Sequence, residues 1–159
     1  MLEVKRWTPK KVLLATDFSE HSNAARQFAT VLARDSGATL LIAHVIEPPP
    51  HSADAGFGGY KVVAEDEATV ERQLLDVVQT DPKVDWSHKL LHGAPAQEIV
   101  KYAAEEGADM IVIGSHGRRG LMRMLLGSVA ENIVRSAKCP VLTIKQPTGG
   151  AKKSAALVS

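Results

Sequence analysis

The feature that most constrains the fold is a set of four short apolar runs that lack the polar alternation of a half-exposed strand. They occupy residues 12–15, 40–43, 110–113 and 141–144. Parallel strands have this composition because helices cover both faces of their sheet. A fifth segment, residues 84–91, alternates between apolar and polar residues, which is typical of a strand at a sheet edge.

Helical periodicity fills the intervals between these segments. Over residues 19–36 we expect a helix whose apolar residues face inward, namely Ala25, Phe28, Ala29 and Leu32. Gly37 follows, at the position where a left-handed helix end favours glycine. A second helix is predicted over residues 62–80, with an inward face formed by Val70, Leu74, Val77 and Val78.

Two more helices are predicted in the second half of the chain. One begins at Pro95, a favoured first-turn residue, and stops at Gly107. The other begins near Ser128, because Ser128 and Glu131 have the spacing of the capping box, in which two side chains pair with backbone N–H groups at the helix start.

The order of these elements is βαβαβαβαβ. It predicts a single α/β domain over residues 1–145, a doubly wound parallel sheet of five strands with helices on both faces. Residues 146–159 contain two consecutive glycines and two lysines, and we expect them to form a flexible tail.

Charge and composition exclude several classes of partner. The chain carries 19 Lys and Arg against 18 Asp and Glu, so its net charge does not attract nucleic acid or an anionic membrane. We find no signal-peptide core at the start of the chain, and no run approaches the roughly 18 apolar residues of a membrane span. The single cysteine, Cys139, has no partner for a disulfide or a zinc site. We therefore expect a cytoplasmic protein that binds neither nucleic acid nor membrane.

Ligands of open α/β sheets bind beyond the carboxyl ends of the strands, at the point where the strand order reverses. Thr16 and Asp17 follow the first predicted strand. A glycine-rich segment, residues 114–128, follows the fourth strand and leads into a helix. These two segments are the candidate binding site.

The glycine-rich segment has the composition of a phosphate site. Glycines let the backbone approach a ligand closely. The amides of Gly127, Ser128 and Val129 fall at a predicted helix N-terminus, where unpaired N–H groups and the helix dipole favour an anion. The Ser128 hydroxyl adds a donor, and Arg118 leads a group of three arginines that raises the local potential unless they are only solvated. The P-loop pattern and the dinucleotide pattern GxGxxG are both absent.

The glycine spacing carries a resemblance to a known family. Gly114, Gly117 and Gly127-Ser128 have the spacing G, two residues, G, nine residues, then G followed by Ser. This resembles the ATP-binding pattern of the universal stress protein family. The resemblance covers residues 10–145, and it includes the opening segment 12–19, the strand end Ala43-His44-Val45-Ile46, and segments 109–117 and 139–142.

The resemblance implies an adenine nucleotide alpha hydrolase-like fold with strand order 3-2-1-4-5, which agrees with an alternating third strand at an edge. It implies a site for ATP, or for ADP or AMP, with Mg²⁺. Asp17 would lie near the nucleotide and its Mg²⁺, directly or through water, with Ala15 and Thr16 beside it. Val45 would meet the adenine through its backbone. The ribose and phosphates would contact Gly114, His116, Gly117, Gly127, Ser128 and Val129.

Simpler interpretations stay open for individual residues. Asp17 is also explained as a loop acid near the start of a helix, where the dipole favours negative charge. Ser128 would cap its helix with or without a phosphate. We expect His116 to be exposed and not catalytic, His44 to be packed within its strand, and Cys139 to be a small buried residue rather than a redox centre.

The fifth strand, Val141–Ile144, would form the other edge of the sheet, and it carries no charge or bulge that protects such an edge. We expect it to pair with the same strand of a second subunit in a two-fold dimer, an arrangement that the resemblance also implies.

The predicted function is a nucleotide-dependent module of the stress response, read by an unidentified protein partner. The alternatives are a slow ATPase or self-phosphorylating protein, and an interaction protein with no nucleotide in its cleft. A flavin or electron-transfer domain of similar topology is the weakest alternative, because the sequence has no flavin signal.

Overall fold

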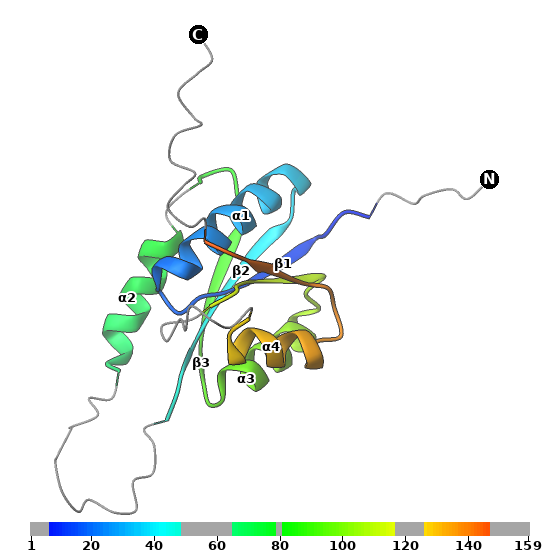
Figure 1. Cartoon of the computed structure of the whole chain (residues 1–159). Coiled ribbons are helices and arrows are strands. Elements are labelled where there is room, and N and C mark those ends of the chain that lie inside the picture. The colour runs from blue at the N-terminus through cyan, green and yellow to red at the C-terminus, as the bar shows by residue number, and fades with distance from the viewer. Residues whose placement is uncertain (1–6, 49–64, 79–80, 117–125, 147–159) are drawn as a thin grey trace, which may run out of the picture.

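The computed structural model describes residues 7–48, 65–78, 81–116 and 126–146, and the other residues lie outside the description (Figure 1). Within these ranges five strands form one sheet: β1 (Lys11–Ala15), β2 (Thr39–Ile46), β3 (Trp86–His92), β4 (Met110–Gly114) and β5 (Val141–Ile144). Every neighbouring pair is parallel, and the order is β3-β2-β1-β4-β5. The predicted fold class and strand order are confirmed.

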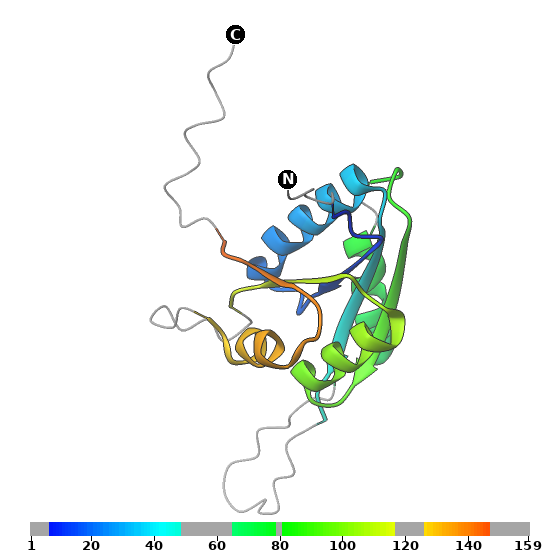
Figure 2. The ribbon, with the colours of Figure 1, turned by 90° about the vertical axis from the view of Figure 1, so that its right-hand side faces the viewer.

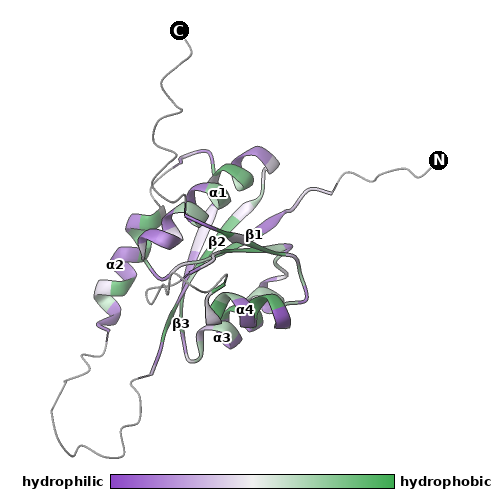
Figure 3. Cartoon of the chain, viewed as in Figure 1, coloured by the Kyte–Doolittle hydropathy of each residue, from purple (hydrophilic) through white to green (hydrophobic). Residues whose placement is uncertain are grey.

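Helices cover both faces of this sheet. They are α1 (Glu20–Ser36), α2 (Glu67–Val78), α3 (Pro95–Glu106) and α4 (Ser128–Ser136). Helices α1 and α2 lie on one face, and α3 and α4 lie on the other (Figures 1 and 2). The inner strands are largely apolar, whereas β3 and the helices mix apolar and polar residues (Figure 3). The doubly covered sheet thus accounts for the continuous apolar runs.

Strand β1 shows how one strand serves two cores. Val12 and Leu14 pack in the cluster under α1 and α2, whereas Leu13 and Ala15 pack in the cluster under α3 and α4. All four are buried. Because successive side chains point to opposite faces of a sheet, a strand covered on both sides has no position left for a polar residue.

Helix α1 approaches the sheet through small residues. Its buried positions are Ser22, Ala25, Ala29 and Ala33. The prediction that Phe28 faces inward is wrong, because its side chain is 45% exposed. Residues 25, 29 and 33 form an i, i+4 row, and this row of alanines lets the helix lie close to the strands while Phe28 falls outside it. Gly37 ends the helix in the left-handed region, as predicted (φ 69°).

Helix α2 begins later than predicted. Residues 62–64 and 79–80 lie outside the described residues, but 65 and 66 are described and are not helical. The Asp66 carboxylate accepts hydrogen bonds from the Thr69 backbone N–H (3.2 Å) and hydroxyl (2.7 Å). An acidic acceptor of this kind satisfies first-turn N–H groups, so the helix starts immediately after Asp66, at Glu67.

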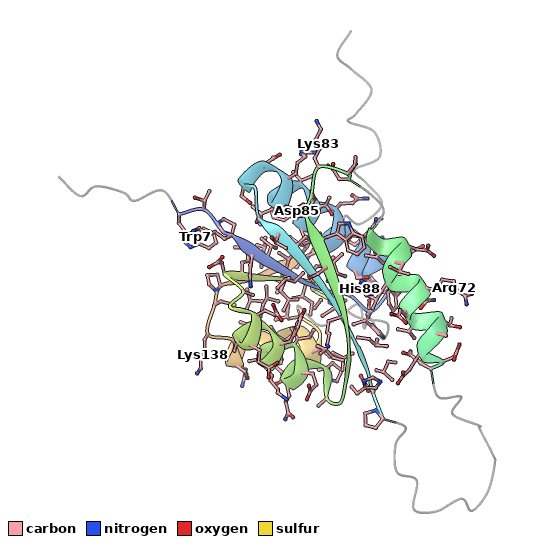
Figure 4. The ribbon with its side chains drawn as sticks, turned by 180° about the vertical axis from the view of Figure 1, so that it is seen from behind. Trp7, Arg72, Lys83, Asp85, His88 and Lys138 are labelled. Carbon is pink, nitrogen blue, oxygen red and sulfur yellow. The ribbon has the colours of Figure 1, made fainter. Side chains whose placement is uncertain are left out.

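Strand β3 is an edge strand, as its alternation predicted. It begins at Trp86 rather than at residue 84, and Trp86 is exposed. Val84 is buried but precedes the strand. The first hydrogen bond to β2 comes just before the strand, where the Asp85 carbonyl accepts from the Leu40 N–H (2.8 Å). Figure 4 shows β3 from behind the molecule, with Asp85 just before the strand and His88 on it.

A carboxylate joins the starts of the two central strands. Asp109 precedes β4, and its Oδ2 accepts hydrogen bonds from the backbone N–H groups of Lys10 (2.8 Å) and Lys11 (2.9 Å) at the start of β1. These two donors hold the pKa of Asp109 below its ordinary value. The contact spans 98 residues of sequence and fixes β1 beside β4 at the end of the sheet opposite the candidate site.

We predict that Asp109→Ala lowers the free energy of unfolding by about 1–2 kcal/mol at pH 7, because two backbone donors lose a charged acceptor. Since the folded pKa is depressed, this contribution is present above the unfolded-state pKa of Asp and is lost as the pH falls through the folded one. Urea unfolding at several pH values measures the difference from the wild type. Asp85→Ala, at an exposed carboxylate, is the control, and an equal loss in both variants would contradict the prediction.

Candidate functional site

The strand order reverses between β1 and β4, and this places two connections side by side. From β1 the chain continues to β2 on one side, whereas β4 and β5 lie on the other. The register pairs Ala15 with Ile113, so the two strands end together at the same edge of the sheet. This is the topological switch point, where ligands of open α/β sheets bind. The residues after β1 and β4 are therefore the candidate site.

The connection after β1, residues 16–19, is held by its own side chains. The Thr16 N–H donates to the Ala43 carbonyl (3.0 Å), and the Thr16 hydroxyl oxygen accepts from the Phe18 N–H (3.1 Å). The same hydroxyl donates to Ser22 Oγ (3.2 Å). Phe18 lies in the left-handed region, with a φ of 63°. A non-glycine residue in that region is strained, and it persists where surrounding contacts hold it.

Asp17 lies in this connection and supports the start of α1. Its Oδ1 accepts hydrogen bonds from the Ser19 N–H (3.0 Å) and hydroxyl (2.5 Å). Ser19 is the N-cap, whose hydroxyl oxygen accepts the Ser22 N–H. Asp17 is therefore a loop acid at a helix start, and its role toward a ligand stays a prediction. The contact with Ser19 still leaves the carboxylate at the switch point.

The end of β4 packs tightly against α1. A methyl group on Gly114 would lie 2.9 Å from the His21 carbonyl oxygen, closer than real contacts allow. Ser115 is buried, and its hydroxyl lies 3.0 Å from His116 Nδ1. The His116 ring is 6.1 Å from the ring of His21, and it is half-buried rather than exposed as predicted. Glycine at 114 thus allows close packing of strand on helix.

Helix α4 starts directly beside the end of β4. The Gly127 N–H donates to the Ser115 carbonyl (2.7 Å), although the two residues are 12 positions apart. This contact corrects the prediction of an unpaired Gly127 amide. The amides of Ser128 and Val129 come next, in the first turn, where a helix supplies no acceptor of its own. Gly117 and Arg118, with Arg119 and Arg123, lie outside the described residues.

The predicted capping box at the start of α4 is wrong. The N-cap is Gly127, which makes no side-chain cap, and Ser128 is the first helical residue. The Gly127 carbonyl accepts the first helical hydrogen bond, from the Glu131 N–H (2.9 Å). With Gly127 as the N-cap, Ser128 is already inside the helix, where its hydroxyl does not serve as the cap.

Two neighbouring residues of β2 border the same site. Val45 is buried in the cluster on the α3 and α4 side of the sheet. His44, on the other side, is also buried, and its Nδ1 lies 2.8 Å from the Thr16 carbonyl oxygen. Sequence reasoning placed His44 in its strand but missed its contact with the residues after β1. No sequence pattern reports such a contact, because it joins residues 28 positions apart.

Cys139 lies away from this site, next to β5. It packs against the core on the α3 and α4 side, and burial raises the pKa of its thiol. A thiol that ionises less readily is a poorer nucleophile. This supports the interpretation of Cys139 as a packing residue.

Comparison with known proteins identifies the fold. The sequence profile of the universal stress protein family matches residues 8–145. The chain belongs to the universal stress protein family. The universal stress protein MJ0531 of Methanocaldococcus jannaschii is 34% identical over 142 residues, which cover 87% of this chain and 83% of that protein.

Two solved structures resemble this universal stress protein. One is MJ0577, also from Methanocaldococcus jannaschii, which is 29% identical, with a TM-score of 0.65 over 89% of this chain and 99% of that one. The other is a universal stress protein in complex with cAMP, 28% identical, with a TM-score of 0.63 over 87% and 98% of the two chains. Among the described residues of this family member, no helix is long and apolar enough to cross a membrane.

We predict that Gly114→Ala destabilises the protein by about 1–3 kcal/mol, because the methyl group meets backbone that is fixed in α1. It should also displace the Ser115 carbonyl that holds α4. Thermal unfolding and the amide exchange rate of Gly127 measure the two effects. Gly107→Ala is the control, since a side chain there meets open space although its φ of 65° costs about 1 kcal/mol. Unchanged Gly127 exchange in Gly114→Ala would contradict the prediction.

Proposed function

We propose that this universal stress protein binds an adenine nucleotide, ATP above others, at the switch point between β1 and β4. The observation that carries the proposal is the contact between the Gly127 N–H and the Ser115 carbonyl (2.7 Å). It fixes the N-terminus of α4 beside the end of β4, across from the residues after β1. The similarity to a universal stress protein in complex with cAMP supports an adenine nucleotide as the ligand.

The phosphates would bind at the start of α4. Because the Gly127 amide is used by Ser115, the donors are the amides of Ser128 and Val129 and the exposed Ser128 hydroxyl. A helix N-terminus favours an anion through such amides and through its dipole. Gly127 contributes by having no side chain to obstruct the approach. Arg118 would add positive charge.

The other end of the nucleotide would reach β2. Val45 would contact the adenine through its backbone, Ala15 and Thr16 would lie along the nucleotide, and Gly114, His116 and Gly117 would border the ribose and phosphates. Adenine rings bind at apolar surfaces with a few backbone partners. The side chains of Ala15 and Val45 are buried in the core, so these residues would offer mainly their backbone.

Mg²⁺ would be held by the phosphates together with Asp17, through water. Mg²⁺ usually retains several waters and binds through one or two carboxylates and substrate phosphates, rather than in a protein cage. Asp17 fits this mode as a single carboxylate at the switch point, and among the described residues there is no group of three or more His, Cys, Asp or Glu side chains that could hold a metal ion. When bound, the ion would neutralise phosphate charge. Asp17 would orient its waters while its Oδ1 accepts from Ser19.

The function of such a site is a switch rather than fast catalysis. A bound phosphate orders the segments that contact it, and a protein partner then distinguishes the loaded form from the empty one. Slow hydrolysis or self-phosphorylation remains the alternative activity. Its test is whether magnesium-dependent ADP release by the wild type exceeds that of Asp17→Ala.

The first experiment identifies the bound molecule. Freshly purified protein is denatured, and the supernatant is separated by nucleotide chromatography. Stoichiometric ATP or ADP would support the proposal. Protein that is purified without nucleotide and also fails to bind added ATP with magnesium would overturn it. The leading alternative would then be an interaction protein that binds no nucleotide.

We predict that Asp17→Asn weakens binding of MgATP by about tenfold, equivalent to about 1.4 kcal/mol, and leaves binding of cAMP without magnesium unchanged. Asparagine keeps an oxygen that accepts from Ser19, so the start of α1 is retained while the charge is removed. Isothermal titration calorimetry, with magnesium and with chelator, measures both affinities. Equal weakening for both ligands would show that Asp17 acts only through the local structure.

We further propose that β5 pairs with its copy in a second subunit. Within the described residues, β5 pairs with β4 and with no other strand. The Pro140 and Ile144 carbonyls accept hydrogen bonds from the β4 side, from Ile111 and Ser115 (2.9 and 2.8 Å). In a parallel pair, alternate residues face the partner strand, so Thr143 turns its backbone groups to the open edge.

Thr143→Pro is therefore predicted to convert the dimer to a monomer without breaking a bond to β4, because proline removes an N–H that faces outward. Thr143→Val, which keeps the N–H, is predicted to remain dimeric. Analytical ultracentrifugation over a range of concentrations reports the mass of each variant. A wild-type protein that is monomeric at every concentration would exclude the dimer.

A further inference from the structure

His44 makes a hydrogen bond whose direction follows from the chemistry of its partner. It lies in β2 with 4% of its surface exposed, and its Nδ1 is 2.8 Å from the Thr16 carbonyl oxygen. A carbonyl oxygen only accepts, so Nδ1 carries the hydrogen and donates it. The bond reaches across from β2 to the first residue after β1.

The opposite nitrogen of the same ring is also engaged. Its Nε2 lies 3.3 Å from Glu65 Oε2, two residues before α2 begins. The Glu65 carboxylate is a hydrogen-bond acceptor that lies within reach of this nitrogen. The two contacts hold the ring at opposite ends and fix its orientation.

The His44 ring also packs against the strained residue after β1. The ring of Phe18 lies 4.4 Å from that of His44, centre to centre. Phe18 has a φ of 63°, a conformation that costs free energy unless its surroundings hold it. His44 contacts the residue on each side of Asp17: Thr16 by a hydrogen bond, and Phe18 by ring packing.

We propose that His44 is a positioning residue of the nucleotide site, which fixes the Asp17 backbone through the bond from its Nδ1–H to the Thr16 carbonyl. This inference rests on the proposed function and extends it to a residue that would not touch the nucleotide. Asp17 must face the phosphates at a set distance, and misplacement of a binding group by about 1 Å is enough to weaken its contribution strongly. The simpler alternative is that His44 only fills space between β2 and Phe18.

Two variants separate these roles, because they place an amide nitrogen at different distances from the backbone. In His44→Asn the side-chain nitrogen occupies the δ position and can replace Nδ1 toward Thr16. In His44→Gln it lies one bond further and can replace only Nε2. If the bond to Thr16 matters, asparagine should restore the wild-type behaviour although glutamine fills more of the histidine volume.

The matched control is His88→Asn. His88 is a half-buried histidine of β3 whose Nε2 lies 3.9 Å from a carboxylate, that of Glu71 (Figure 4). Like His44 it is a strand histidine with a carboxylate nearby, but it lies on the edge strand and makes no contact with Thr16. Any general cost of replacing a strand histidine by asparagine appears in this variant.

The first readout needs no nucleotide. Amide hydrogen exchange of Phe18 and Ser19, followed by NMR in the empty protein, reports the order of residues 16–19, since their N–H groups donate to Thr16 Oγ1 and Asp17 Oδ1. We expect exchange in His44→Gln to be about tenfold faster than in the wild type, the equivalent of one hydrogen bond. His44→Asn and His88→Asn should stay within about threefold.

The second readout is the affinity for MgATP, measured by calorimetry. We expect binding by His44→Gln to be weaker by about tenfold, and binding by His44→Asn to stay within about threefold of the wild type. Equal exchange and equal affinity in the Asn and Gln variants would overturn the positioning role. A different outcome is faster exchange in His44→Gln together with a wild type that binds no nucleotide. It would support the ordering of residues 16–19 by the hydrogen bond from His44 to Thr16, and it would refute only the proposed function.

Discussion

The burial of β1 on both faces is the constraint on which the rest of the structure depends. β1 is hydrogen-bonded to β2 on one side and β4 on the other, while its side chains serve both cores. Residues 12–15 are buried on both faces, so after Lys11 at the start of the strand the next polar side chains come where the strand ends. Thr16 and Asp17 stand at that end for this reason, and the end of β4 lies beside them.

Long-range backbone contacts complete the site. Gly127 donates to Ser115, and Thr16 donates to Ala43, so α4 and the start of α1 are both attached to the sheet at the same edge. At the opposite end of the strands, where β1 and β4 begin, Asp109 fixes the start of β1 beside β4. The sheet is therefore held at both ends of its central pair. A ligand at the switch point would meet groups that are already in place, which lowers the cost of binding.

Histidine and glutamate pairs connect α2 and the residues just before it to β2 and β3. His44 faces Glu65, His92 faces Glu67 at 2.7 Å, and His88 faces Glu71 at 3.9 Å. The two pairs to β3 are exposed or half-exposed, and surface ion pairs contribute little stability. The pair of His44 differs, because that ring is buried and its other nitrogen reaches the connection after β1. The segment just before α2 is thereby linked to the candidate site.

The sequence by itself predicted five strands and four helices in the right succession, because continuous apolar runs mark strands that are covered on both faces and helical periodicity fills the intervals. The strand order was implied by the resemblance to the universal stress protein family. The sequence also located the glycine-rich segment after β4. Only the tertiary structure decided that Gly127 rather than Ser128 caps α4, that Phe28 faces outward, and that His44 holds Thr16. These outcomes depend on contacts between residues far apart in the chain, and a local pattern carries no information about a partner on another strand.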